Sequence, residues 1–177
     1  TGTTTLSRNA SVMSGSTVSN TGTVDGTSTL TVEGIYNNQT GAVTSAPLTV
    51  NASGVVNNSG TLSGKTTVSG KMVNTGTMTR GATMNGSGKV TNSGAVALGS
   101  SSDASNASIL ELKNNSVFDN LSGGTIALDN NKNAVHLNND STLKNEKGGT
   151  ITVTNSSTGA GINIWGGTAD FINDGTA

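Results

Sequence analysis

One short phrase recurs along this chain and restricts its fold more than any other feature. Its simplest copies read as an apolar residue, any residue, asparagine, serine or threonine, and glycine, as in VVNNSGTL at 55–62 and KVTNSGAV at 89–96. Aligned on the asparagine, the copies are centred on Asn20, Asn38, Asn58, Asn74, Asn92, Asn120, Asn145 and Asn173. An apolar residue stands two positions before every one of them, although only 31% of the chain is apolar. The chain is therefore a repeat protein.

Each period contains three short segments in which apolar and polar residues alternate. One precedes the asparagine, and another begins after the glycine, where Val24, Val43 and Leu62 are expected to return to the core. A further segment lies between these, as in Leu110-x-Leu112. Alternation with period two is typical of strands, and the Gly, Asn, Ser and Asp clusters between segments are typical of turns. No helical period occurs, so we predict an all-β fold.

Repeats of this length, with three strands each, predict a β-solenoid in which strands of successive coils pair in parallel. We expect about eight coils around a narrow interior, truncated at both ends because the chain begins with TGTTTL and stops at NDGTA, in mid-repeat. The eight asparagines should stack as a structural turn ladder, with the following glycine supplying positive φ. A sugar-binding surface of Asn and Thr is the alternative reading of the phrase.

The repeat changes after its fifth copy. We predict one β-helical fragment over 1–177, with regular short coils over 1–98 and longer coils with loop insertions over 99–177. Insertions in solenoids gather as loops on one side and often carry binding, although tolerated solvent loops are the simpler explanation. If Val135, Leu137, Ile162 and Ile164 face inward, the lone histidine and the lone tryptophan face outward. The candidate ligand or self-association contacts are Asp103, Asn106, Lys132, His136 and Trp165.

Composition excludes several classes of function. The net charge is −1 and the nine Lys and Arg residues are scattered, which gives no electrostatic footprint for nucleic acid. No apolar run approaches the roughly 18 residues of a membrane span, so this segment should not insert into a membrane. There is no cysteine and no HExxH, P-loop or EF-hand pattern, and the ten acidic residues are dispersed. We therefore expect no catalytic residues, no metal and no cofactor.

The VxN-S/T-G-T-V ladder, the absence of cysteine and the Thr, Ser, Asn and Gly composition resemble the passenger domains of Gram-negative autotransporter adhesins, including the self-associating kind. The resemblance is one of repeat style over essentially the whole chain. It implies a right-handed, three-faced parallel β-helix, exported across the outer membrane and displayed at the cell surface. The implied partners are a host surface protein or glycan, or a second copy of the chain on a neighbouring cell.

The expected function is therefore non-catalytic adhesion, with cell–cell aggregation and biofilm formation. Three alternatives remain open at this point: a structural spacer stalk of a longer surface protein, a polysaccharide-degrading β-helix and a phage-spike β-helix. An ice-binding face would need a regular threonine column. The residue after the junction glycine forms such a column only imperfectly, because Ala42 and Ala95 interrupt it.

Overall fold

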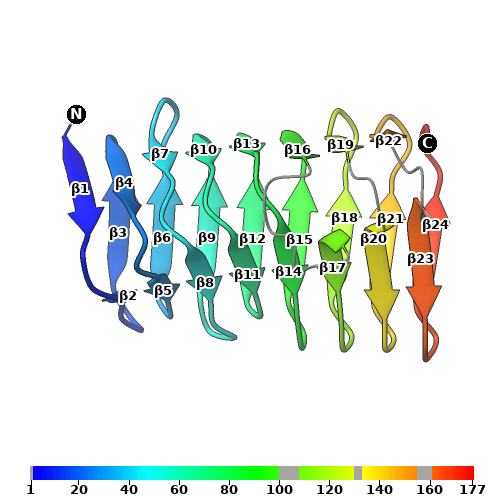
Figure 1. Ribbon diagram of the computed structural model, residues 1–177, viewed down its shortest axis with the longest axis horizontal. Coiled ribbons are helices and arrows are strands. Elements are labelled where there is room, and N and C mark those ends of the chain that lie inside the picture. Colours follow the sequence, from blue (N-terminus) through cyan, green and yellow to red (C-terminus); the bar gives the residue numbers. More distant parts are fainter. Residues whose placement is uncertain (1, 100–107, 130–132, 155–160) are drawn as a thin grey trace.

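The computed structural model describes residues 2–99, 108–129, 133–154 and 161–177, and in it the chain winds into a rod of three eight-stranded sheets. Each coil contributes one strand to each sheet, and strands of successive coils pair in parallel. The two ends of the chain lie at opposite ends of the rod (Figure 1). This is the arrangement of a three-faced right-handed parallel β-helix. It confirms the all-β prediction and the expected number of coils.

The strands fall into three sheets, here called A, B and C. Sheet A contains β1 (Thr3–Leu6), β4 (Thr23–Gly26), β7 (Val43–Thr44), β10 (Thr61–Leu62), β13 (Thr77–Met78), β16 (Ala95–Gly99), β19 (Thr125–Asp129) and β22 (Thr150–Thr154). Sheet B contains β2 (Ala10–Val12), β5 (Leu30–Val32), β8 (Leu48–Val50), β11 (Thr66–Val68), β14 (Ala82–Met84), β17 (Ser108–Leu112), β20 (Asn133–Asn138) and β23 (Ile162–Trp165). Sheet C contains β3 (Thr17–Asn20), β6 (Ile35–Asn38), β9 (Val55–Asn58), β12 (Lys71–Asn74), β15 (Lys89–Asn92), β18 (Val117–Asn120), β21 (Thr142–Asn145) and β24 (Asp170–Asn173).

The interior is filled by columns of side chains that run along the rod. In sheet C the apolar residue two positions before each asparagine stacks on its equivalent in the next coil, as Met72 does on Val90. These residues are buried from Tyr36 to Leu143, whereas Val18 in the first coil is 42% exposed. A tube this narrow needs only a few aliphatic side chains per coil. The low apolar content of the chain is therefore compatible with a closed core.

The predicted asparagine ladder is confirmed. The side-chain amide of each ladder asparagine donates from Nδ2 to Oδ1 of the next one, over seven bonds of 2.6 to 2.9 Å from Asn20 to Asn173. Each of the seven donating Nδ2 atoms also reaches a backbone carbonyl of the following coil, as Asn58 reaches Thr77 O at 3.2 Å. Buried amides with both groups bonded add no desolvation penalty. The ladder is thus part of the core rather than a binding surface.

The predicted positive φ of the glycine that follows each ladder asparagine is confirmed at Gly41, Gly123 and Gly148 and is wrong at the other five junctions. Gly60, Gly76 and Gly94 do not have positive φ; instead a Cβ on any of them would lie 2.1 to 2.4 Å from a carbonyl oxygen of the preceding coil. The absent side chain therefore allows the coils to approach closely at this corner. After Asn120 the two roles fall on consecutive residues, because Gly123 has positive φ and Gly124 makes the close approach to the preceding coil.

One coil departs from the expected alternation. Val43 is in register with Thr61, and Thr44 with Leu62, so the threonine faces the core and the valine faces outward. The prediction that Val43 returns to the core is therefore wrong. The cause is Gly41, whose φ of +82° places it in the turn, so that buried Ala42 takes the position of the junction glycine. Ala42 consequently does not belong to the outward threonine column.

The buried Thr44 hydroxyl is fully satisfied. Its Oγ1 donates to Asn38 Oδ1 at 3.1 Å and lies 2.7 Å from the hydroxyl oxygen of Tyr36. Because threonine has a single hydroxyl proton, the Tyr36 hydroxyl must be the donor to Thr44. The large tyrosine and the small threonine also fill the coil together, where another coil uses Val56 and Leu62.

Tyr36 makes the rod sensitive to alkaline pH. Burial raises the pKa of its hydroxyl above 10.0, and the bond with Thr44 only partly opposes this. Below pH 10 the phenol keeps its proton in both the folded and the unfolded chain. Above pH 10 the unfolded chain loses the proton first, so the free energy of unfolding falls as the pH rises toward the pKa of Tyr36 in the folded chain. Tyr36 is the only tyrosine. We expect its near-ultraviolet phenolate absorbance to appear together with loss of the β circular-dichroism signal.

The control for this titration is Tyr36→Phe, which removes the phenol and should lessen the alkaline loss of stability. A phenolate signal that develops at pH 10 while the strands remain intact would contradict the burial argument.

Candidate functional site

The outward face of sheet B changes character along the rod. Its central row is made of small hydroxyl residues in the first five coils, namely Ser11, Thr31, Thr49, Thr67 and Thr83. The same row continues in register with Glu111, His136 and Asn163. This change begins in β17, the first strand of sheet B after the longer repeats start. The row thus passes from uniform hydroxyls to a carboxylate, an imidazole and an amide.

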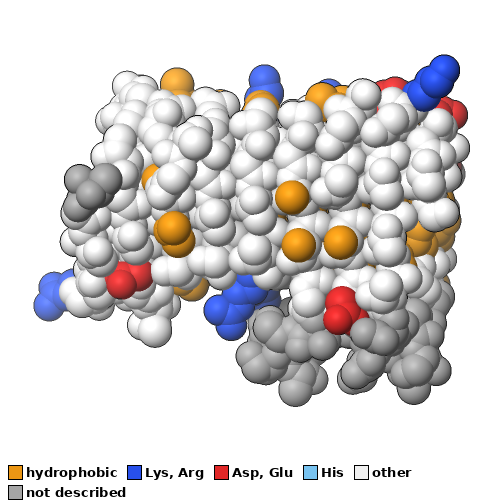
Figure 2. Space-filling view, turned by 90° about the horizontal axis from the view of Figure 1, so that it is seen from above, with side chains coloured by type: hydrophobic (Ala, Val, Ile, Leu, Met, Phe, Trp, Pro, Cys, Tyr) orange, Lys and Arg blue, Asp and Glu red, His pale blue; other side chains and the backbone are white. Residues whose placement is uncertain are grey.

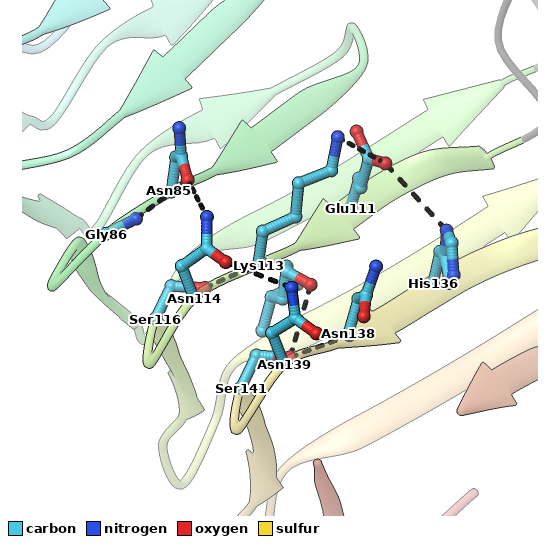
Figure 3. Close-up of polar contacts among 11 residues, drawn as sticks. Asn85, Gly86, Glu111, Lys113, Asn114, Ser116, His136, Asn138, Asn139 and Ser141 are labelled. Carbon is cyan, nitrogen blue, oxygen red and sulfur yellow. Dashed lines mark hydrogen bonds and ion pairs between the residues drawn. The ribbon is translucent and has the colours of Figure 1, made fainter. Parts of the chain in front are cut away.

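Glu111 is the centre of the polar contacts on this face (Figure 3). Its Oε1 is 2.8 Å from Lys113 Nζ and 3.8 Å from His136 Nδ1. All three side chains are partly covered, and the Nε2 atom of His136 is buried and has no hydrogen-bond partner among the described residues. Lys113 follows buried Leu112, so strand alternation turns it to the same outward side as Glu111.

Trp165 completes the group at the last strand of the sheet. Its ring is tilted by 35° against that of His136, with centroids 6.2 Å apart, and the residue is 69% exposed. In the register of the sheet it lies beside Asn138, whose side chain points to the same outward side. We call Glu111, Lys113, His136, Asn138 and Trp165 the β17–β23 cluster. It combines an accessible aromatic ring with one anionic, one cationic and one amide side chain.

Regular turns at one end of these strands hold the cluster in place. At this edge Asn114 donates to Asn85 Oδ1 at 2.7 Å, and Asn139 donates to Asn114 Oδ1 at 3.1 Å (Figure 3). Asn114 and Asn139 have positive φ, which asparagine tolerates better than most residues. Asp140 accepts from the side-chain hydroxyl and backbone N–H of Thr168, and these bonds lower the pKa of its carboxyl group.

Sequence reasoning found part of this cluster. The structure brings the predicted contacts His136 and Trp165 together, and both face outward as expected. It also adds Glu111 and Lys113, which the sequence analysis missed. The signal for Glu111 was available, because it stands between Leu110 and Leu112 as His136 stands between Val135 and Leu137. The other three candidates, Asp103, Asn106 and Lys132, lie outside the described residues.

Ile164 faces inward by alternation, but its burial would also require a neighbouring coil on each side. It is in register with buried Leu137, as predicted for an inward residue, yet it is 50% exposed. Its strand β23 is the last in sheet B, so only one side of it is covered by another strand of this sheet. The exposed apolar side chain of Ile164 is therefore distinct from the outward surface that carries Trp165.

The remaining surface offers less chemistry. A shallow hollow of about 270 Å³ lies over β16, β19 and β22 and is lined mainly by small side chains such as Ala97, Ala127 and Thr152. The face in Figure 2 carries few charged side chains, and these lie toward its margins. Within the described ranges no three His, Asp or Glu residues are placed to share a metal ion. Nor does the described part of the chain contain a helix long and apolar enough to cross a bilayer.

Comparisons with known proteins leave the family open. No protein-family model and no curated protein sequence matches this chain. Among solved structures, it is similar to the crystal structure of a hyper-glycosylated TibA fragment whose glycosylation is catalysed by TibC. That similarity covers 99% of this chain and 93% of the other, at 15% identity and a TM-score of 0.29. Similarity at this level does not establish a common fold or function.

Proposed function

We propose that this chain is a non-catalytic segment of a secreted bacterial surface adhesin, of the kind found in Gram-negative autotransporter passengers. It is exported across the outer membrane and attaches the cell to a host surface protein or glycan, or to a second copy on a neighbouring cell. Aggregation and biofilm formation follow from such attachment. Many weak contacts between crowded rods add up through avidity, so no single tight site is required.

The β17–β23 cluster is the observation that carries this proposal. The interior columns and the asparagine ladder are occupied in maintaining the fold, and most of the central row of sheet B consists of small hydroxyls. Aromatic and charged residues together are typical of contact surfaces, where a few large side chains supply most of the binding energy. A rod that served only as a spacer has no need for an exposed tryptophan beside a histidine and an ion pair.

Attachment by coated beads tests the proposal. Beads carrying the purified chain should aggregate, or should bind surfaces coated with matrix proteins or glycans. The triple variant Glu111→Thr, His136→Thr, Trp165→Thr continues the hydroxyl row of sheet B at its first two positions and removes the indole beside it. We expect it to lose on the order of tenfold in attachment. The matched control replaces Thr31, Thr49 and Thr67 of the same row by serine and should attach like the unchanged chain.

A coil deletion separates adhesion from the spacer alternative. Removing 59–92 joins Asn58 to Ser93, which regenerates the Asn-Ser-Gly junction and leaves the cluster intact. Attachment should survive this deletion and fail in the triple cluster variant. If the triple variant attaches as well as the unchanged chain, the cluster is not the adhesive surface. If unchanged beads neither aggregate nor bind any coated surface, adhesion itself is contradicted and the spacer reading is favoured.

A further inference from the structure

We propose that the β17–β23 cluster binds a neutral oligosaccharide, with one sugar ring lying on Trp165. This rests on the proposed function, for which it names the class of ligand.

Trp165 has the geometry of a platform. The two residues that follow it, Gly166 and Gly167, have φ of +74° and +66° and carry no side chain that could cover the ring. His136 lies next to the indole on the same sheet face, with the two rings tilted rather than stacked face to face. An exposed indole presents a broad, rigid apolar surface at little cost in conformational entropy. The C–H face of a sugar ring is flat, weakly polar and matched to such a surface.

The groups around the platform match sugar hydroxyls, which both donate and accept hydrogen bonds. The carboxylate of Glu111 accepts, the ammonium of Lys113 donates, and side-chain amides do both. Asn138 and Asn163 each flank this site in the register of the sheet. Their side-chain amides have no hydrogen bond to another described residue, so they are available to a ligand. Neighbouring strands lie about 4.8 Å apart, which sets these groups at the scale of a single sugar ring.

The charge balance favours a neutral ligand over an anionic one. Glu111 and Lys113 are paired at 2.8 Å, so the cluster has no excess of positive charge to recognise sulfate or carboxylate groups. Because Lys113, the one cation of the cluster, is already paired with Glu111, a sulfated or acidic glycan would add negative charge that no further cation of the cluster compensates. A protein partner would be expected to bury the exposed ring more broadly than a sugar does, and it is a separate outcome of the test below.

The intrinsic fluorescence of the intact chain provides the test, because Trp165 is the only tryptophan and reports on this site alone. The probes are cellotetraose, maltotetraose and the tetramer of N-acetylglucosamine, with a heparin-derived tetrasaccharide as the charged comparison. We expect at least one neutral tetrasaccharide to change the emission in a saturable way, with a dissociation constant on the order of 1 mM or below. The heparin fragment should bind at least about tenfold more weakly.

Calorimetry on variants then assigns the binding to the cluster. Trp165→Ala should weaken binding of the responding sugar by at least about tenfold, whereas Trp165→Phe, which keeps an aromatic surface, should retain most of it. Thr49→Ala, on the outward face of the same sheet but far along the rod, serves as the control and should bind like the unchanged chain. The inference is overturned if no neutral tetrasaccharide binds, if the heparin fragment binds as well as the neutral sugars, or if Trp165→Ala leaves the affinity unchanged.

The bead assay distinguishes this failure from failure of the proposed function. If Trp165→Ala abolishes bead attachment while no tetrasaccharide binds, the cluster is still the adhesive surface. Its ligand is then a protein or a second copy of the chain instead of a saccharide. If unchanged beads attach to nothing, the adhesive function is lost whether or not sugars bind.

Discussion

Gly94→Ala is expected to lower the free energy of unfolding by about 3 kcal/mol, although it only adds one methyl group. A Cβ at this position would lie 2.2 Å from the carbonyl oxygen of Gly76, one coil below. The obstacle is backbone rather than a flexible side chain, so relief requires the two coils to separate. The same carbonyl accepts the backbone N–H of Ala95 at 2.8 Å, and separation would weaken that bond too. Urea unfolding followed by circular dichroism should reveal a midpoint lowered by about 1 to 2 M.

Gly99→Ala is the matched control for this prediction. An added Cβ at Gly99 meets no atom of the described residues within 4 Å, and the residue does not have positive φ. Its substitution should change the free energy of unfolding by less than about 0.5 kcal/mol, or raise it slightly by restricting the unfolded chain. Equal midpoints for the two variants would mean that close approach of the coils is not what selects glycine at the junction.

Asn58→Leu is expected to have an effect of similar size, because it interrupts the amide ladder in the middle of the rod. Asn58 accepts from Asn38 Nδ2 at 2.8 Å and donates to Asn74 Oδ1 at 2.6 Å, and all of these amides are buried. Leucine has a similar volume but leaves a donor on one side and an acceptor on the other short of a partner. Each buried group left unsatisfied costs about 1 to 3 kcal/mol, so we expect a total of about 3 kcal/mol in urea unfolding.

The preceding residue supplies the control. Asn57 lies on the same strand, faces outward and donates to Asn37 Oδ1 at 2.9 Å in an exposed position. Asn57→Leu should cost no more than about 0.5 kcal/mol because water replaces the lost partner. If both leucine variants unfold at the same urea concentration, the buried ladder contributes nothing beyond an ordinary surface bond.

The regular part of this fold could be predicted because the alternation of apolar residues and the position of the asparagine are set within one coil and recur in every coil. The apolar residue and the asparagine share parity in every copy, so one alternation argument places both. The orientation of Val43 was predicted wrongly because an extra turn residue, Gly41, shifts the alternation by one position. Nothing near Val43 in the sequence indicates which residue belongs to the turn. The glycine at Gly94 was explained by the wrong cause, because close approach between coils depends on a partner one period away.

The site was harder to predict than the fold for a related reason. Trp165 and His136 stand out as single residues of their type, but Glu111 becomes notable only when its coil is aligned with the next one. Lys113 joins the cluster through its ion pair with Glu111, a contact that depends on side-chain conformation rather than on sequence spacing. The cluster could therefore be located from the sequence but not completed.

The amide ladder also gives the rod a direction. All seven side-chain bonds run the same way, with the nitrogen of each asparagine directed toward the oxygen of the next, from Asn20 to Asn173. Reversing one amide would set two nitrogens face to face on one side and two oxygens on the other. It would also turn an oxygen toward the backbone carbonyl that now accepts from Nδ2. The dipoles therefore add along the axis and polarise one another, so that a coil joining either end must present the matching half of an amide pair.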